Sequence, residues 1–269
     1  MLFDSHCHFT TDPGLKEIEG ELAAKIADSE LGCLVDVGTD LPTSFQAVSS
    51  ANKYNFCYAA VGFHPSELAS CNDEALLQIE KLAKEEPKVV AIGEIGLDFH
   101  WPENPPQDVQ VYWFKRQIEL AKKLGKPICI HSRDADQLTM DVLKECGAFG
   151  GPSEGPLAPG QTRVLMHCYS GSAEMAKEYI KLGAYISVAG PITYKNNRKG
   201  IEVVKVIGLA HLLVETDSPY LAPEPLRGTK NVPTNVRYTA AKVAEILEID
   251  FSQVAEKTAE NAKRFYGIK

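Results

Sequence analysis

Short apolar runs alternate along the chain with longer stretches in which apolar residues recur every three or four positions. The short runs predict β-strands at residues 2–8, 33–38, 57–62, 89–94, 128–131, 164–167, 184–188 and 212–215. The longer stretches predict amphipathic helices, because their apolar positions follow the 3.6-residue period; Ile18, Leu22 and Ile26 form one such row. Two further helical patterns, at 234–247 and 252–265, follow the last strand.

Eight strands that alternate with helices predict an α/β protein with the (β/α)8 TIM-barrel fold. A doubly wound open sheet is the alternative, but no Gly-x-Gly-x-x-Gly fingerprint follows the first predicted strand. The length of 269 residues fits one barrel, so we expect a single domain over residues 1–269. The Gly- and Pro-rich segment 146–161 interrupts the alternation and is interpreted as a loop insertion at the face opposite the active site.

Composition narrows the classes of protein that the chain can belong to. An apolar content of 44% is enough for a sizeable core, and no apolar run reaches the 18 residues of a membrane span. The N-terminus lacks a basic and apolar leader, so we expect none to be removed.

Seven scattered cysteines without a Cys-x-x-Cys motif predict a reducing compartment, the cytoplasm. A net charge of −8 argues against a protein that coats nucleic acid by bulk electrostatics, but permits a nuclease with a few placed cations.

Histidines and carboxylates gather where the predicted strands end. His6 and His8 are two residues apart in the first strand, so both side chains point the same way. Other strands end at or near His64, Glu94, His131, His167 and Asp217. In a barrel the carboxyl ends of all strands meet on one face, where active sites lie. Imidazole and carboxylate together bind Zn²⁺, Mn²⁺, Co²⁺ or Fe²⁺, and Mg²⁺ less readily, so a metal centre is predicted there.

The predicted centre holds one or two divalent ions per chain: Mg²⁺, Mn²⁺ or Zn²⁺. His6, His8 and Asp217 can hold one ion, and His131 and His167 a second, with Glu94 placed to bridge both. Two ions about 3.5–4 Å apart can activate a water molecule for a displacement at phosphorus or carbon. Asp217 is predicted to take the proton from that water, so Asp217 and Glu94 are the predicted catalytic residues.

Substrate contacts are predicted from cations and aromatic residues at the same strand ends. The predicted substrate-binding residues are His64, Arg133, Tyr169, Arg227 and Lys230. Arg227 and Lys230 flank turn-forming residues and are placed to hold phosphate. Tyr169, Phe63, Phe99 and Trp101 are candidates for stacking on nucleobases, with ordinary packing as the alternative for each. Glu215 is either a site residue or a buried, paired carboxylate, and Asp4 either orients a histidine or caps the barrel floor.

Taken together, these motifs resemble the TatD-type metal-dependent deoxyribonucleases, a branch of the amidohydrolase-like TIM barrels. The resemblance is carried by residues 4–8, 62–65, 93–98, 131–133, 167–171, 215–221 and 227–228, in the expected order over essentially the whole chain. It implies metal ligation by His6, His8, Glu94, His131, His167 and Asp217. It also implies hydrolysis of DNA phosphodiester bonds at ends or in single strands, often as a 3′→5′ exonuclease.

The chain departs from the family pattern in two places, of which only the first bears on the substrate. The family often reads Arg-Gly-x-x-Asn-Glu-Pro where this chain has Val232 before Pro233, so a charge at the substrate mouth is missing. The Gly- and Pro-rich segment around 150–160 also looks longer than is typical.

Two other functions are weighed against the nuclease. The first is a carbon-centred hydrolase of the amidohydrolase type: a D-aminoacyl-tRNA deacylase, a lactonase or a cyclic amidase. Many such relatives carry a carboxylated bridging lysine, whereas this chain has Glu94, which favours the nuclease. The second is a metal-binding interaction protein without turnover, which the predicted base Asp217 disfavours. We expect a monomer or a weak homo-oligomer that does not bind membranes.

Overall fold

The computed structural model describes residues 1–152 and 155–269. Its strands are β1 (Leu2–Cys7), β2 (Leu31–Val37), β3 (Cys57–Val61), β4 (Val89–Asp98), β5 (Ile128–Arg133), β6 (Val164–Met166), β7 (Tyr185–Val188) and β8 (Leu212–Val214). They form one eight-stranded sheet in chain order, and the pairs β1–β2, β3–β4, β4–β5, β5–β6 and β7–β8 are parallel. A parallel sheet in chain order with helices between its strands is a (β/α)8 barrel, which confirms the predicted fold class.

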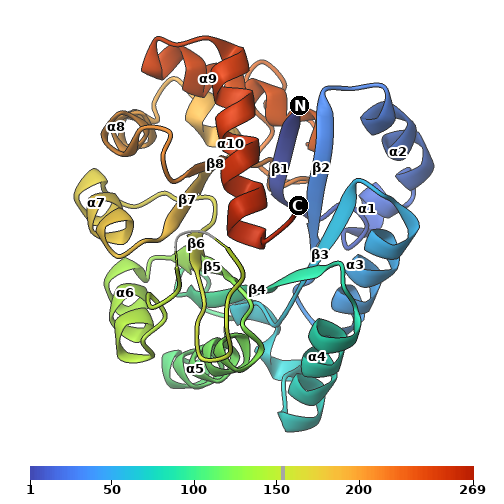
Figure 1. Cartoon of the computed structure of the whole chain (residues 1–269), viewed down its shortest axis with the longest axis vertical. Helices are drawn as coiled ribbons and strands as arrows, with labels where there is room; N and C mark the ends of the chain where they lie inside the picture. The colour runs from blue at the N-terminus through green and yellow to red at the C-terminus, as the bar shows by residue number, and fades with distance from the viewer. Residues whose placement is uncertain (153–154) are drawn as a thin grey trace. The chain divides into compact units, whose positions relative to one another are not determined.

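Helices separate the strands throughout the chain (Figure 1). The α-helices are α1 (Pro13–Lys16), α2 (Glu19–Ala27), α3 (Leu41–Lys53), α4 (Asp73–Glu85), α5 (Gln107–Leu124), α6 (Asp136–Glu145), α7 (Ala173–Lys181), α8 (Arg198–Ile207), α9 (Val236–Leu247) and α10 (Phe251–Tyr266). Short 3₁₀ helices are η1 (Pro65–Ser70), η2 (Gly190–Thr193) and η3 (Pro233–Asn235). Among the described helices, none combines the length and the apolar character that a bilayer span requires.

Two compact units make up the chain. The first comprises Met1–Asp36 and His167–Arg264, and the second comprises Val37–Met166 and Phe265–Lys269. Within the first unit the first and last strands are neighbours, because Ser5 Oγ donates to the Val214 carbonyl over 3.1 Å and the Asp217 N–H donates to the His6 carbonyl over 3.0 Å. The prediction of a single domain over residues 1–269 stays a prediction.

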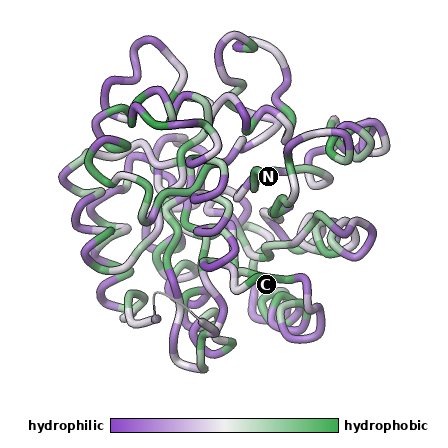
Figure 2. The backbone as a smooth tube through the Cα atoms, turned by 45° about the horizontal axis from the view of Figure 1, so that its top comes forward, coloured by the Kyte–Doolittle hydropathy of each residue, from purple (hydrophilic) through white to green (hydrophobic). Residues whose placement is uncertain are grey.

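Strand β4 shows why these sequences form buried strands. All ten of its residues are buried, and Ile92, Ile95 and Leu97 have no exposed surface. Such a near-continuous buried run is expected of a parallel strand whose two faces are both covered. The helices instead alternate polar and apolar positions, visible as purple and green bands along the tube in Figure 2. Apolar packing of the helices on the strands is therefore what holds the strand ends in place.

The carboxyl half of β4 continues beyond the predicted end at Glu94. It pairs with β5 residue for residue, with Gly96 opposite His131 and Asp98 opposite Arg133. The two glycines of this stretch, Gly93 and Gly96, resemble turn signals in the sequence, but here they allow two strands to approach closely. The predicted boundary was therefore too early, and the correction adds Asp98 to the strand.

Gly96 is expected to tolerate no side chain. Its φ of +147° is a conformation that L-residues rarely adopt, and a Cβ built there would lie 1.9 Å from the His131 carbonyl oxygen. We expect Gly96→Ala to lower the free energy of unfolding by about 2–5 kcal/mol, measured by urea denaturation. The matched control is Gly20→Ala in α2, where no described atom lies within 4 Å of the added Cβ. That change should raise stability by up to about 1 kcal/mol, and equal effects of the two substitutions would refute the explanation.

The Gly- and Pro-rich segment is a loop, as predicted, over its described residues 146–152 and 155–161. Buried Arg163 anchors it by donating to the Pro152 carbonyl over 2.8 Å and to the Phe265 carbonyl over 2.9 Å. The Thr162 hydroxyl donates to the Lys126 carbonyl over 2.6 Å, just before β5 begins. The loop therefore leads into the amino end of β6, opposite the carboxyl end of β5 where His131 lies. Residues 153–154 of the prediction fall outside the described part of the chain.

Candidate metal centre

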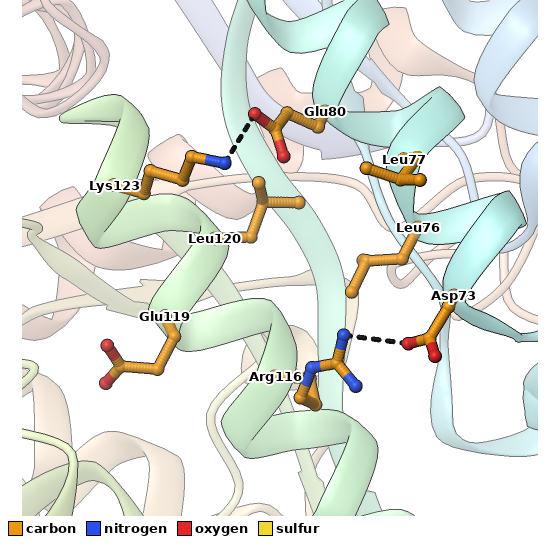
Figure 3. A pocket seen from close by; sticks show the side chains of 8 residues that line it. All are labelled: Asp73, Leu76, Leu77, Glu80, Arg116, Glu119, Leu120 and Lys123. Carbon is orange, nitrogen blue, oxygen red and sulfur yellow. Dashed lines mark hydrogen bonds and ion pairs between the residues drawn. The ribbon is translucent and has the colours of Figure 1, made fainter.

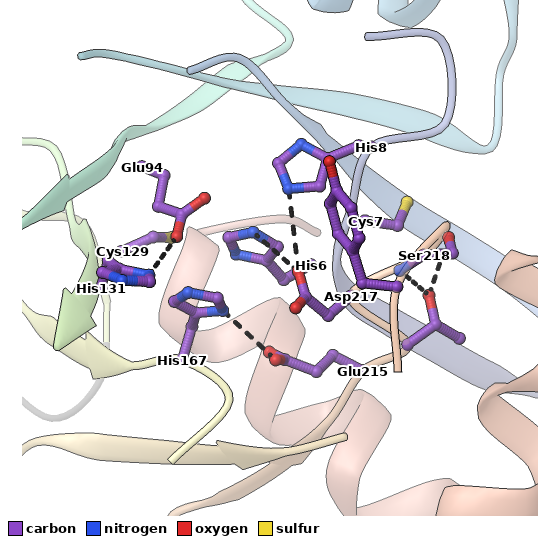
Figure 4. A network of polar contacts seen from close by, with 12 residues as sticks. His6, Cys7, His8, Glu94, Cys129, His131, His167, Glu215, Asp217 and Ser218 are labelled. Atoms are coloured by element: carbon purple, nitrogen blue, oxygen red, sulfur yellow. Dashed lines mark hydrogen bonds and ion pairs between the residues drawn. The ribbon is translucent and has the colours of Figure 1, made fainter. Parts of the chain in front are cut away.

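In the first unit, the structure brings together the three residues predicted to hold one ion. His6 lies near the end of the buried strand β1, His8 follows the strand, and Asp217 follows β8. Asp217 Oδ1 lies 3.7 Å from His8 Nε2 and 3.9 Å from His6 Nε2 (Figure 4). One possible ligand atom from each side chain lies within 4.8 Å of the others. Residues 209 or more apart in sequence thus meet because β1 and β8 are adjacent.

A network of hydrogen bonds fixes the segment that carries Asp217. The fully buried Asp4 carboxylate accepts from the Thr216 N–H over 2.9 Å and from the Thr216 hydroxyl over 2.6 Å. The Asn231 amide donates to the Thr216 carbonyl over 2.9 Å. Burial raises the pKa of Asp4 well above its usual value, against the opposing hydrogen bonds from Thr216. Asp4 therefore holds the backbone next to Asp217, a role that differs from the two considered from the sequence, orienting a histidine and capping the barrel floor.

His167 lies beside this cluster in the same unit. Its ring stacks on that of His6 with centroids 3.9 Å apart, and its Nδ1 lies 3.3 Å from Glu215 Oε1. Burial would raise the pKa of Glu215, but the hydrogen bond and charge of His167 outweigh burial and lower it. When Nδ1–H donates to the carboxylate, Nε2 keeps a lone pair for a metal ion. Glu215 is fully buried, so its alternative as a paired carboxylate is confirmed.

The second unit holds a second cluster of histidines and carboxylates. His131 Nδ1 lies 2.9 Å from Glu94 Oε1, and His131 Nε2 lies 3.1 Å from Asp98 Oδ2. His64 joins them, with its Nε2 3.7 Å from Glu94 Oε1 and its ring edge-on to His131 at 4.4 Å. Possible ligand atoms of His64, Asp98 and His131 lie within 4.8 Å of one another. Figure 4 shows the Glu94–His131 pair.

Asp98 is a site residue that the sequence reasoning missed. The Asp98 N–H donates to the side-chain oxygen of buried Gln110 over 2.8 Å, and the Gln110 side-chain amide donates to the Asp98 carbonyl over 2.9 Å. These two hydrogen bonds fix the backbone of Asp98. Burial raises the pKa of the Asp98 carboxyl, but hydrogen bonds from His131 and the His100 N–H, with the His131 charge, lower it overall. A signal was present in the sequence: Glu94 and Asp98 are four residues apart, so a strand through both places them on one face.

Both clusters have the chemistry of a divalent metal site. Each offers at least three imidazole or carboxylate ligand atoms within 4.8 Å, the number of protein ligands that catalytic zinc sites use. Most of these side chains are buried, so the position of each is fixed by packing and hydrogen bonds. The donor sets fit Zn²⁺, Mn²⁺, Co²⁺ or Fe²⁺ and accommodate Mg²⁺ less readily.

The predicted substrate residues of the first unit lie on loops that follow strands. The Arg227 guanidinium lies 4.4 Å from the centre of the Tyr194 ring, and its side chain is 62% exposed. Lys230 Nζ lies 3.9 Å from Asp12 Oδ1. The Tyr169 hydroxyl donates to the Ser172 carbonyl over 2.9 Å. The two cations are therefore accessible, and each has an acidic neighbour, since Glu224 lies 4.0 Å from Arg227.

In the second unit, Arg133 is exposed and lies 5.3 Å from the centre of the Trp101 ring, which is 48% exposed. His64, another predicted substrate residue, lies beside the second cluster through Glu94. Phe63 is only 1% exposed, so the packing alternative holds for it and its ring offers no surface to a base.

A pocket between α4 and α5 contains none of the predicted site residues. Leu76, Leu77 and Leu120 line it together with the ion pairs Arg116–Asp73 and Lys123–Glu80 (Figure 3). Its lining includes neither imidazole nor thiol, so it offers none of the histidine ligands that the two clusters provide.

Comparisons with known proteins identify the family of the chain. A family model described as TatD related DNase matches residues 3–267. The chain is 42% identical over 270 residues to an uncharacterized metal-dependent hydrolase, YabD, of Bacillus subtilis, covering 100% of both chains. It is 34% identical to an uncharacterized metal-dependent hydrolase, TatD, of Mycobacterium tuberculosis, covering 99% of this chain and 98% of that one. The crystal structure of YJJV, a TatD homolog from Escherichia coli, superposes with a TM-score of 0.89 at 28% identity, covering 100% and 98%.

Proposed function

We propose that this chain, which belongs to the TatD-related DNase family and is a metal-dependent hydrolase, cleaves phosphodiester bonds of DNA as a 3′→5′ exonuclease. The observation that carries the proposal is the match to the family model over residues 3–267, together with two clusters of metal-binding side chains. DNA ends or single strands are the proposed substrate. A cytoplasmic location and a monomeric or weakly associated state belong to the same proposal.

The proposal places a cluster of metal ligands in each unit, at the carboxyl ends of its strands, where the active sites of (β/α)8 barrels lie. In it, the metal ligands are His6, His8, Glu94, His131, His167 and Asp217. Bound divalent ions lower the pKa of water and neutralise charge on the phosphate in the transition state. Asp98 supports the ligand set by its contact with His131 Nε2.

Asp217 is proposed to accept the proton of the attacking water. Its side chain is 14% exposed, so solvent and substrate can reach a carboxylate that is otherwise enclosed. Its backbone is held by the His6 carbonyl, which keeps the oxygens beside His6 and His8. A carboxylate fixed in this way needs little reorganisation when the proton moves.

His64 is proposed to contact a phosphate oxygen. The Ser66 N–H donates to His64 Nδ1 over 3.1 Å, so Nδ1 is an acceptor and the neutral ring carries its proton on Nε2. Nε2 faces Glu94, one of the proposed ligands, at 3.7 Å. A hydrogen-bond donor at that position can hold a substrate oxygen next to the reacting centre.

The cations Arg133, Arg227 and Lys230 are proposed to hold flanking phosphates. Each contact that neutralises a phosphate of a single strand releases counterions. The slope of log K against log salt concentration therefore becomes more negative by about 0.7 per contact. With a net charge of −8 on the chain, binding should rely on these few contacts and weaken steeply with salt.

The function is tested on metal-stripped protein with end-labelled single-stranded DNA. Mg²⁺, Mn²⁺ or Zn²⁺ is added in turn, and we expect stepwise shortening from the 3′ end that requires an added metal ion. An Asp217→Asn preparation controls for contaminating nucleases. Intact DNA with every metal, together with hydrolysis of an aminoacyl-tRNA or a lactone, would replace the nuclease by a carbon-centred hydrolase.

A further inference from the structure

Tyr220 presents an exposed aromatic ring beside a candidate metal ligand. The residue is 58% exposed, although large aromatic side chains usually bury most of their surface. Its ring lies edge-on to the His8 imidazole, with centroids 6.0 Å apart and planes at 73°. A flat aromatic surface is thus available to a ligand beside His8, one member of the cluster formed by His6, His8 and Asp217.

The backbone of Tyr220 is fixed with respect to Asp217. The Tyr220 N–H donates to the Asp217 carbonyl over 2.9 Å, which closes a tight turn between the two residues. The fully buried Asn231 amide donates to the Tyr220 carbonyl over 2.8 Å and to the Thr216 carbonyl over 2.9 Å. The backbone of Tyr220 is therefore fixed relative to Asp217, the proposed base. A ligand that stacks on the Tyr220 ring is thereby positioned relative to Asp217.

Cations occupy the same loop. Arg227 and Lys230 lie between Tyr220 and the start of η3, and both side chains are more than half exposed. The Tyr194 hydroxyl donates to the Ala222 carbonyl over 2.9 Å, which ties this loop to the preceding one and supports the Arg227 guanidinium. Exposed aromatic rings interleaved with cations are the combination that binds single-stranded nucleic acid.

We propose that Tyr220 stacks on the nucleobase next to the scissile phosphate, and that this contact selects an unpaired terminal nucleotide. The inference rests on the proposed nuclease function and adds a specificity-determining residue to it. A base can stack on a side chain only when it has left its own helical stack, so the contact favours single strands over duplex ends. Every base has a π-face, so the contact discriminates little between the four bases.

The test compares two single-stranded oligonucleotides that differ only at the 3′ terminus, one with a normal nucleotide and one with an abasic sugar. In the wild type, kcat/KM should be about 5- to 150-fold higher for the base-bearing substrate, the range measured for stacking of one base. Tyr220→Ala should bring that ratio close to 1, whereas Tyr220→Phe should retain it. Fluorescence anisotropy with the metal-free protein gives the same comparison for binding, without turnover.

Tyr112→Ala is the matched control, because Tyr112 is 52% exposed and lies on α5 against Arg116. Its ratio should equal that of the wild type. Thermal unfolding checks that Tyr220→Ala is folded. If it is not, Tyr220→Leu, which keeps apolar bulk without a ring, takes its place. An equal loss on both substrates would make Tyr220 a support for His8 and overturn the inference. Cleavage of DNA by the wild type without preference for a terminal base would overturn the inference alone, and absence of DNA cleavage would overturn it with the proposed function.

Discussion

Asp217→Asn should abolish turnover and keep part of the metal binding. The amide retains an oxygen ligand of the same size beside His6 and His8, but it cannot accept a proton as the carboxylate does. Loss of a general base typically lowers kcat by about 10²- to 10⁴-fold, and loss of ligand charge adds to this. Metal content by mass spectrometry and DNA shortening on the same preparation separate the two effects.

Asp28→Asn is a suitable control for this variant, because Asp28 is exposed just after α2 in the same unit. It should leave both metal content and turnover unchanged. If Asp217→Asn turned over DNA at the wild-type rate, Asp217 would be removed from the role of base. If the variant lost all its metal, the loss of turnover would instead report the loss of a ligand.

Glu94→Ala should lose metal and activity together. Glu94 is 4% exposed, and one of its carboxylate oxygens lies 2.9 Å from His131 Nδ1 and 3.7 Å from His64 Nε2. Its removal takes a negative charge from between two imidazoles, which weakens the cluster's attraction for a cation. We expect kcat to fall by about 10²- to 10³-fold or more, with fewer ions bound per chain in the same sample.

Glu85→Ala, at an exposed position at the end of α4, is the control in the same unit and should behave as the wild type. Full metal occupancy in Glu94→Ala would show that Glu94 is not a ligand. Adding Asp98→Asn to the series reports which of the two carboxylates beside His131 matters more for the metal, since they contact opposite nitrogens of its ring.

Local patterns in the chain were enough to predict the fold and most of the candidate metal-binding side chains, Asp98 excepted. Apolar runs bounded by turn residues mark buried strands, because a strand covered on both faces must be apolar throughout. The two-residue spacing of His6 and His8 determines that they face the same way. The order of strands and helices then predicts where the strand ends lie, because parallel strands joined by helices all run in one direction. The family resemblance, confirmed by the match over residues 3–267, came from the same motifs.

Which side chains from distant segments contact each other was decided only by the tertiary structure. Asp4 and Thr216 are 212 residues apart, and no local pattern in either segment requires their hydrogen bond. The pairing of Glu215 with His167, the continuation of β4 to Asp98, and the exposed ring of Tyr220 beside His8 likewise depend on which strands and loops become neighbours. By itself, the sequence of this protein determined the positions and order of its strands and its candidate metal ligands, because these follow from local periodicity. The structure alone decided which carboxylate meets which imidazole, since that depends on side-chain packing between segments distant in the chain.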